Sequence, residues 1–288
     1  MNVVVCDSTG QRRVVGSGCA GLESTAGPSP VGSPALLQAR GLTKRFGERA
    51  ALVDVSLDLW PGEVLAVVGE SGSGKTTLLQ LLAARLQPDA GSVLFQDREG
   101  QMHEVTTMDE ARLRRLARTD WGFIHQDAAL GLRLSVSAGA NIGERLMALG
   151  ERNFGRLRGT AIDWLQQVEI DPARIDDLPL VFSGGMRQRL QIARNLVTSP
   201  RLVFMDEPTS GLDVSVQARI LDLIRRLSRE MQLAVVLVTH DLAVARLLAE
   251  RMIVMRSGRI VEAGLTDQLL EDPRHPYTQL LVSSVLPT

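Results

Sequence analysis

The chain has 288 residues and a formal net charge of −1, which allows one large or two small domains and gives no electrostatic reason to expect nucleic acid as a partner. Its longest apolar runs, such as residues 233–238, are far shorter than the about twenty residues that cross a bilayer. The composition therefore excludes a membrane-spanning helix, and we expect any membrane role to depend on a partner protein.

We expect residues 1–34 to lie outside the folded domain. Residues 16–34 are dense in Gly, Ser and Pro and contain little that could fill a core, which is typical of a disordered tail or of residues before the true start. Cys6 and Cys19 have no metal-ligand pattern around them, and the N-terminus lacks the pattern of a secretion signal. These features predict a cytoplasmic protein with a disordered extension over residues 1–34 and one ordered domain over residues 35–288.

The ordered region begins with strands. Residues 36–40 and 52–59 alternate apolar and polar side chains, as half-exposed strands do. After a Trp-Pro-Gly turn, residues 64–68 form a continuous apolar run that predicts a buried strand, and residues 77–84 have the composition of a helix. Three further elements are predicted before residue 126: a strand at 91–96, an arginine-rich surface helix at 108–118 and a buried strand at 121–125.

An all-helical insertion is predicted over residues 127–198, because residues 136–149 and 160–168 have helical spacing and no strand pattern occurs before residue 181. Short apolar strands separated by helices then follow, which predicts a parallel sheet covered on both faces. The strands are expected at residues 202–205, 234–239, 252–256 and 259–263, and the helices at residues 187–197, 214–230 and 242–248.

Residues 69–77 read Gly-Glu-Ser-Gly-Ser-Gly-Lys-Thr-Thr and fit the phosphate-binding loop pattern, between a strand and a helix as that pattern requires. Glycines let successive N–H groups point inward, and the following helix adds its positive end. Lys75 supplies a charge for the β- and γ-phosphates, and the Thr76 hydroxyl can bind Mg²⁺. An ordinary Gly/Ser-rich turn is the alternative, which the flanking elements disfavour. We expect a nucleoside triphosphate to contact Gly69, Glu70, Ser71, Gly72, Ser73, Gly74, Lys75, Thr76 and Thr77.

Two adjacent carboxylates, Asp206 and Glu207, follow the apolar strand at residues 202–205. A parallel strand delivers them at its carboxyl edge, where the phosphate loop also opens. Asp206 is placed to hold Mg²⁺, and Glu207 is then free to orient and deprotonate an attacking water. A pair of acids by itself more often marks a solvated strand end. Its position after a phosphate loop favours the catalytic interpretation.

A second anion-binding helix start is predicted before residue 187. Ser183 is a good N-cap, and the amides of Gly184 and Gly185 are free to meet an anion. Taken alone, the segment is a capped helix. Together with the motifs above, it resembles the signature sequence of ABC-type ATPases.

Residues 35–288 resemble that family throughout, because every motif stands in the family's order. The phosphate loop matches its Walker A motif, and Asp206-Glu207 matches its Walker B pair. Gln126 matches the glutamine that senses Mg²⁺ and the attacking water. His240 resembles the switch histidine, which contacts the γ-phosphate and stabilises charge that develops in the transition state.

The resemblance implies an α/β P-loop NTPase fold with a RecA-like parallel sheet core, an antiparallel β subdomain and the all-helical insertion. Residues 210–213 resemble the loop that crosses the family's dimer interface. Phe46 stands where the family stacks an aromatic ring on adenine, although a core or surface phenylalanine is nearly as consistent with that position. ATP and Mg²⁺ are the implied cofactors, with Glu207, His240 and Lys75 as catalytic residues and Thr76, Gln126 and Asp206 at the metal.

A composite nucleotide site is a further implication. In the family, one subunit offers the phosphate loop and its partner offers the signature helix start. This chain has one copy of each, so the resemblance implies pairing with a second copy of itself or a related nucleotide-binding domain. ATP joins the halves, hydrolysis lets them part, and the helical insertion transmits the motion to a partner.

The signature departs from the family's usual Leu-Ser-Gly-Gly-Gln at Phe182 and Met186. The lost glutamine removes one polar contact, but the hydroxyl and backbone donors remain, so we expect turnover to be retained. Met186 is expected in one subgroup, the ATP-binding subunits of the bacterial carbon–phosphorus lyase machinery, which breaks down phosphonates. The segments that resemble this subgroup are residues 131–133, 137–147, 175–179, 182–186 and 191–197.

This second resemblance implies an ATPase that docks as a dimer on a soluble lyase core and drives a conformational change in it. Residues 272–278 resemble instead the tail of oligopeptide and nickel importer ATPases. The alternative is therefore a transport ATPase that acts through a membrane permease for peptides, nickel or phosphonate. A non-catalytic, nucleotide-gated adaptor is a third interpretation.

Overall fold

The computed structural model describes residues 4–6, 12–14 and 34–285. Two short strands, β1 (Val4–Cys6) and β2 (Arg12–Val14), pair antiparallel within the segment for which we predicted disorder. The rest of that predicted extension lies outside the described residues. Within the described part of the chain, no helix combines the length and the apolar character that crossing a membrane requires.

A six-stranded sheet forms the centre of the domain, in the order β12-β11-β5-β10-β9-β8. Its first five strands along the chain are parallel, as predicted, while the edge strand β12 runs antiparallel to β11. The reversal follows from the two-residue turn at Ser257 and Gly258, whose φ angles of 47° and 77° suit a tight hairpin. The strands are β5 (Val64–Val68), β8 (Trp121–Ile124), β9 (Leu202–Asp206), β10 (Ala234–Val238), β11 (Arg251–Arg256) and β12 (Arg259–Leu265).

A second, antiparallel sheet of four strands has the order β4-β3-β6-β7, which confirms the implied antiparallel subdomain. The strand β7 was not predicted, because its three residues are too few for an alternating pattern to be recognised. The bounds are β3 (Leu37–Phe46), β4 (Arg49–Leu59), β6 (Ala90–Gln96) and β7 (Met102–Glu104).

Both faces of the parallel sheet are covered. Alternate residues of β5 contribute to two separate cores, with Val64, Ala66 and Val68 in one and Leu65 and Val67 in the other. The first core contains buried residues of α6, α7 and α8, and the second contains those of α1 and the antiparallel sheet. This explains the uninterrupted apolar sequence of the strand. The helices are α1 (Lys75–Leu82), α6 (Gly184–Leu196), α7 (Val214–Glu230) and α8 (Leu242–Leu248).

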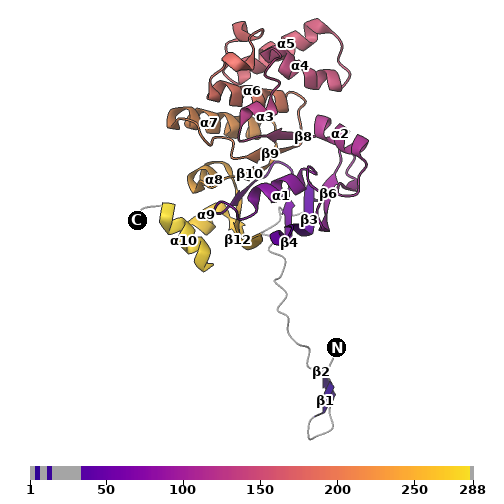
Figure 1. Cartoon of the computed structure of the whole chain (residues 1–288), viewed down its shortest axis with the longest axis vertical. Helices are drawn as coiled ribbons and strands as arrows, with labels where there is room; N and C mark the ends of the chain where they lie inside the picture. The colour runs from indigo at the N-terminus through magenta and orange to yellow at the C-terminus, as the bar shows by residue number, and fades with distance from the viewer. Residues whose placement is uncertain (1–3, 7–11, 15–33, 286–288) are drawn as a thin grey trace.

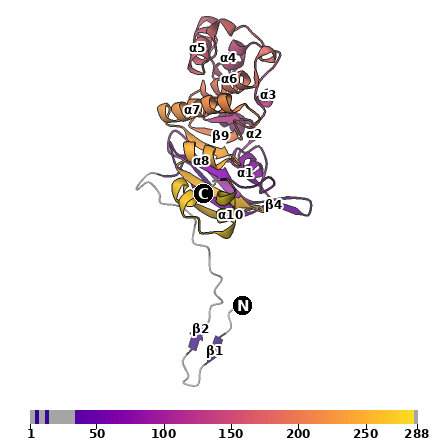
Figure 2. The same cartoon turned by 90° about the vertical axis from the view of Figure 1, so that its left-hand side faces the viewer.

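The insertion between β8 and β9 is all-helical, as predicted, and it occupies one end of the molecule in both views (Figures 1 and 2). Its helix α5 begins at Phe154, not at residue 160, because the Asn153 side chain caps it by accepting from the Arg156 N–H. The insertion contains α3 (Ala128–Gly131), α4 (Ala138–Ala148), α5 (Phe154–Gln167), the 3₁₀ turns η1 (Pro172–Arg174) and η2 (Pro179–Val181), and α6.

The remaining helices of the described chain are one before the insertion and two after β12. The arginine-rich helix α2 (Glu110–Thr119) has no buried residue, as expected for a surface helix, and the Asp109 side chain caps it. The chain ends in α9 (Thr266–Glu271) and α10 (Pro276–Val285), which the sequence analysis did not predict. Figure 1 shows α9 and α10 beside the antiparallel strands, at the end of the molecule away from the insertion.

Candidate nucleotide-binding site

The phosphate loop connects β5 to α1, and its glycines are required by conformation and by space. Gly69, Gly72 and Gly74 have φ angles of 148°, 81° and 104°, a region that favours glycine. A Cβ atom on Gly69 would lie 2.3 Å from the Met255 carbonyl oxygen, and one on Gly74 would lie 2.6 Å from that of Ala51. Any side chain at either position would therefore displace the loop from the neighbouring backbone.

Lys75 is held inside the curl of this loop. Its Nζ donates to the Gly69 carbonyl at 2.7 Å and to the Glu70 carbonyl at 2.9 Å, and only 6% of the residue is exposed. Burial lowers the pKa of Lys75, while the nearby carboxylates of Glu207, Asp206 and Glu70 oppose that shift. An ammonium held by carbonyl oxygens inside the loop is suited to bond phosphate oxygens that enter it.

The Ser73 side chain adds a second polar group to the loop. It is 1% exposed, and its hydroxyl has no hydrogen-bond partner among the described residues. Buried hydroxyls are normally paired, so an unpaired one beside the loop's N–H groups is a donor that a phosphate oxygen can use. This observation supports the assignment of Ser73 to the phosphate site.

Thr76 and Asp206 bring two oxygen ligands together although they lie on different elements. The Thr76 Oγ1 donates to Asp206 Oδ1 at 3.2 Å. Burial raises the pKa of Asp206, the neighbouring Glu207 raises it further, and the Thr76 hydrogen bond and Lys75 oppose the shift. A divalent cation would supply the missing positive charge. Mg²⁺ typically takes one or two protein oxygens and completes its shell with water and phosphate, so this pair fits it.

Glu207 and His240 meet at the carboxyl edge of the sheet, because β9 and β10 are adjacent parallel strands. The His240 Nδ1 lies 3.1 Å from Glu207 Oε1. Glu207 has a φ of 42°, unusual for a non-glycine residue, and its N–H donates to the Val238 carbonyl at 2.9 Å. A strained backbone conformation often marks a functional position. Here the hydrogen bond to β10 fixes the position of the Glu207 backbone, from which the side chain extends.

Gln126 follows β8, and its Nε2 donates to the Ser210 hydroxyl at 3.1 Å. Both residues line a cleft of about 320 Å³ that also includes Gly184 and Leu212. The cleft therefore lies between the segment at Gln126, the start of α6 and the loop that follows β9.

The start of α6 is capped as predicted, because the Ser183 Oγ accepts from the Met186 N–H at 3.3 Å. A Cβ on Gly185 would lie 2.4 Å from Val216 Cγ1, so a glycine is needed where α6 meets α7. Among the described residues, no hydrogen bond or ion pair joins residues 183–185 to residues 69–77. In the described part of one chain, the two segments predicted to bind anions thus share no hydrogen bond or ion pair.

Phe46 ends β3 with 53% of the residue exposed, and Lys44 Nζ lies 5.9 Å from the centre of its ring. The ring is therefore not a core residue, and Lys44 lies over one of its faces. Phe46 pairs with Arg49 across the β3–β4 turn, and Arg49 Nη2 donates to the Gly72 carbonyl at 3.4 Å. That hydrogen bond brings the Phe46 turn next to the phosphate loop.

The sequence analysis missed how α6 holds the segment that carries Gln126. The Gln191 Oε1 accepts from the His125 N–H at 2.6 Å, and its Nε2 donates to the His125 carbonyl at 3.2 Å. Gln188 Nε2 donates to the same carbonyl at 3.3 Å, and Asn195 Oδ1 accepts from the Phe123 N–H at 3.0 Å. These three amide side chains stand at helical spacing on an otherwise apolar face of α6. That pattern in the sequence could have indicated a buried polar contact.

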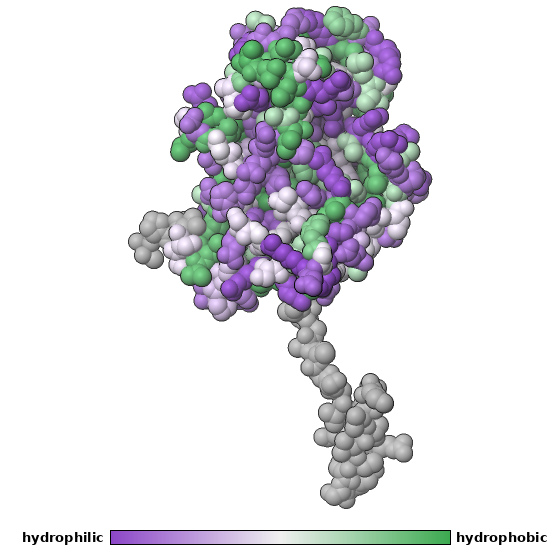
Figure 3. Space-filling model, in the orientation of Figure 1, coloured by the Kyte–Doolittle hydropathy of each residue, from purple (hydrophilic) through white to green (hydrophobic). Residues whose placement is uncertain are grey.

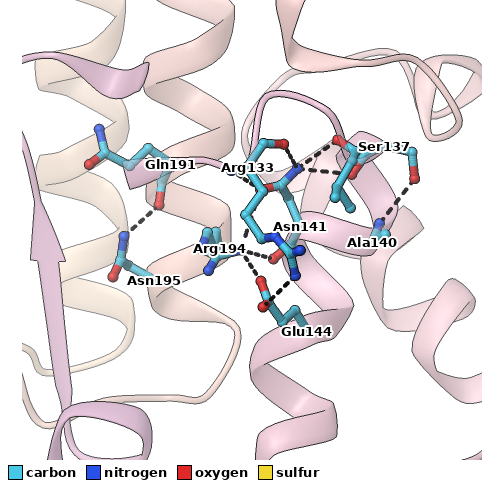
Figure 4. A network of polar contacts seen from close by, with 9 residues as sticks. Arg133, Ser137, Ala140, Asn141, Glu144, Gln191, Arg194 and Asn195 are labelled. Carbon is cyan, nitrogen blue, oxygen red and sulfur yellow. Dashed lines mark hydrogen bonds and ion pairs between the residues drawn. The ribbon is translucent and has the colours of Figure 1, made fainter. Parts of the chain in front are cut away.

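A polar network joins α4 to α6 inside the insertion (Figure 4). Arg194 donates to the Asn141 carbonyl at 2.9 Å and to Glu144 at 2.8 Å, and Arg133 donates to Glu144 at 3.0 Å. Asn141 is fully buried, and its amide donates to three carbonyl groups, including those of Arg133 and Ser137. Because α6 also forms hydrogen bonds with the His125 backbone, it links the insertion to the segment that carries Gln126.

The chain is similar to known ATP-binding proteins. The ABC transporter family matches residues 52–210, and the C-terminal region of oligopeptide/dipeptide transporters matches residues 261–288. The chain is 62% identical over 251 residues to the phosphonates utilization ATP-binding protein PhnK of Escherichia coli, which covers 87% of this chain and 98% of PhnK. It is 38% identical over 261 residues to a peptide import ATP-binding protein of Brucella melitensis, covering 87% of this chain and 77% of that protein.

A solved structure is similar as well. The dimeric, post-hydrolysis ATP-binding cassette MJ0796 bound to ADP and Pi superimposes with a TM-score of 0.72 and 29% identity, covering 80% of this chain and 98% of that chain. A second dimeric structure of the same bacterial ABC transporter cassette gives a TM-score of 0.71. Both comparisons concern cassettes that associate in pairs.

Proposed function

The chain belongs to the ABC transporter family of ATP-binding proteins, and on that basis we propose that it is the ATP-hydrolysing subunit of a carbon–phosphorus lyase machinery for phosphonates. The observation that carries this proposal is the 62% identity to PhnK over nearly the whole of that protein. The identity to peptide import proteins is much lower and covers a smaller share of each of them.

Hydrolysis is assigned to the residues at the carboxyl edge of the sheet. The phosphates of ATP bind the free N–H groups of the phosphate loop and the ammonium of Lys75. Thr76, Asp206 and Gln126 would hold Mg²⁺, whose positive charge would neutralise charge on the β- and γ-phosphates. The Glu207 carboxylate accepts a proton from the water that attacks the γ-phosphorus, and ADP leaves as the bond to the bridging oxygen breaks.

His240 completes the arrangement. Its Nδ1 lies within hydrogen-bond distance of Glu207, so the imidazole can orient that carboxylate while its other nitrogen faces the γ-phosphate. A donor held in place before the reaction stabilises the charge that develops on the transferred phosphoryl group. Phe46 holds adenine by stacking.

The complete site needs two chains. The start of α6, with Ser183, Gly184 and Gly185, offers its hydroxyl and N–H groups to the ATP on a second copy of this chain. Two observations support this arrangement: no hydrogen bond joins the two anion-binding segments within the described part of one chain, and the similar cassettes are dimers.

The helical insertion is proposed to bind the lyase core. Figure 3 shows apolar residues gathered at the end of the molecule that the insertion forms. An exposed apolar surface of this kind marks an interaction site. Its exposed large apolar residues are Leu130, Met147, Leu149, Phe154, Leu178, Leu180 and Val181.

Affinity purification and growth test the proposal together. We expect a tagged protein, expressed at its natural level, to retain a soluble phosphonate-cleaving complex, and we expect deletion of its gene to prevent growth on methylphosphonate as the sole phosphorus source.

The second candidate, a peptide import ATPase, is favoured by the match of residues 261–288 to the oligopeptide/dipeptide transporter C-terminal region. Retention of a membrane permease with unimpaired growth on methylphosphonate would favour that candidate instead.

A further inference from the structure

The C-terminal helix α10 contacts the phosphate loop through one side chain. The hydroxyl of Tyr277 accepts a hydrogen bond from the Glu70 N–H at 3.1 Å, and only 6% of Tyr277 is exposed. The two residues are 207 positions apart. Tyr277 belongs to the tail segment at residues 272–278, to which the proposed reaction gives no role.

This hydrogen bond controls the orientation of one peptide unit. The Glu70 N–H and the Gly69 carbonyl belong to the same planar trans peptide, so they point in opposite directions. The Gly69 carbonyl accepts from Lys75 Nζ at 2.7 Å. When Tyr277 holds the N–H outward, the carbonyl must point inward to the Lys75 ammonium. Rotation of this peptide would break both hydrogen bonds together.

Tyr277 is itself held from two sides. The Arg256 guanidinium lies 4.8 Å from the centre of its ring, and the Tyr277 N–H donates to His275 Nδ1 at 3.1 Å. The N–H groups of Arg274 and His275 both donate to the Glu262 carboxylate, at 2.8 and 3.1 Å. The hydroxyl is therefore preorganised, which makes a hydrogen bond to it effective in fixing the loop.

The far end of the phosphate loop is held by the same region of the chain. The Gly258 N–H, in the turn between β11 and β12, donates to the Ser73 carbonyl at 2.9 Å. The backbone at Met255 approaches Gly69 so closely that no Cβ fits there. The C-terminal part of the domain thus contacts the loop at its start and near its end.

We propose that Tyr277 is a positioning residue for ATP binding, whose hydroxyl fixes the Gly69–Glu70 peptide and thereby keeps Lys75 directed into the phosphate loop. This inference rests on the proposed binding of ATP by residues 69–77. Tyr277 acts through the peptide and Lys75 and does not contact the nucleotide. It therefore affects how well the free loop is prepared for ATP, not the transfer of the phosphoryl group.

The test compares Tyr277→Phe with the control Thr278→Val. The first substitution removes only the hydroxyl that Glu70 uses. Thr278 is fully buried in the same helix, and its hydroxyl has no partner among the described residues. Kd for Mg·ATP is measured by calorimetric titration, KM and kcat by phosphate release, and Tm by thermal unfolding.

We expect Tyr277→Phe to raise Kd and KM for ATP about three- to tenfold, the factor that corresponds to one intramolecular hydrogen bond. We expect kcat at saturating ATP to be retained, and Thr278→Val to leave Kd and KM unchanged. An equal rise in both variants, an unchanged Kd in Tyr277→Phe, or a fall in kcat alone would each overturn the inference. If the wild-type chain does not bind Mg·ATP, the proposed function fails first.

Discussion

Three side chains of the candidate site have surroundings that determine their chemistry. Burial lowers the pKa of Lys75 and raises that of Asp206, so each charge depends on a partner of opposite sign. Glu207 is half-buried and lies beside His240. This arrangement keeps Lys75 buried in the phosphate loop, while Thr76 and Gln126, two of the proposed metal ligands, are exposed to solvent.

The role of Glu207 is tested by Glu207→Gln, which keeps the shape of the side chain but cannot accept a proton from water. We expect hydrolysis to fall by about 10²- to 10⁴-fold, because that is the usual contribution of a general base. ATP binding is retained, so the variant is expected to accumulate as an ATP-bound dimer in size-exclusion chromatography. Lys75→Ala is expected to abolish hydrolysis without dimer accumulation. Normal hydrolysis by either variant would contradict these roles.

His125 makes stability depend on pH. Burial and the neighbouring Arg85 lower its pKa from 6.5 to about 4, while Asp127 opposes the shift. The Arg85 Nη1 lies 3.0 Å from His125 Nε2, a hydrogen bond that requires this nitrogen to be unprotonated. Between pH 4 and 6.5 the unfolded chain thus binds a proton that the folded chain does not.

We therefore expect the contribution of His125 to stability to decrease as the pH falls from about 6.5 to about 4, and to be constant below that range. His125→Gln retains an acceptor for Arg85 but does not titrate. Urea unfolding midpoints measured across this range should fall less steeply with acid for His125→Gln than for the wild type. Identical slopes would show that the histidine environment is not as described.

The helix α6 connects the insertion to the nucleotide site. Its first turn offers the proposed signature donors, its buried amides Gln188 and Gln191 hold the His125 backbone, and Arg194 joins it to α4. A single helix thus joins the insertion by hydrogen bonds to His125, the residue before Gln126. The helix α6 thus connects two parts of the molecule, which its N-terminal cap alone does not indicate.

Gln191→Leu tests this connection. The half-buried His125 N–H loses its acceptor, which should lower the free energy of unfolding by about 1 kcal/mol. Because the phosphate loop is untouched, we expect kcat to fall while KM for ATP is maintained. Gln166→Leu on the exposed side of α5 is the matched control and should alter neither quantity. An unchanged kcat in Gln191→Leu would exclude coupling through this contact.

At the scale of the whole molecule, the proposed function requires two chains. Lys75 belongs to the phosphate loop and Ser183 to the start of α6, and no hydrogen bond joins these segments in the described part of one chain. Two identical chains related by a two-fold axis would form two equivalent sites, each with a loop from one chain and a helix start from the other.

Mixing two inactive variants tests the composite site. Lys75→Ala lacks the loop cation, and Ser183→Glu places a negative charge where the partner's phosphate is expected. Each variant alone should be inactive. In a mixture, about half of the dimers contain one intact site, so turnover should recover to about a quarter of the wild-type rate if the sites act independently. A mixture without recovered activity would contradict the two-chain site.

Most of the elements and the order of the motifs could be predicted from the amino-acid pattern alone. The phosphate loop, the acids at the end of β9 and the cap at Ser183 are encoded within a few residues by glycine conformations, side-chain periodicity and capping. The parallel sheet and the helical insertion followed from the same local patterns. Short strands such as β7 and the helices α9 and α10 lacked a pattern long enough to be recognised.

Which distant side chains come into contact could be seen only in the folded chain. Three hydrogen bonds join segments that are far apart along the chain. They are those of Tyr277 with Glu70, Gln191 with His125 and Thr76 with Asp206. Such contacts depend on how strands are ordered in the sheet and how helices pack across it, and no local propensity encodes them. The sequence therefore indicates the chemistry of the site, and packing determines its positioning.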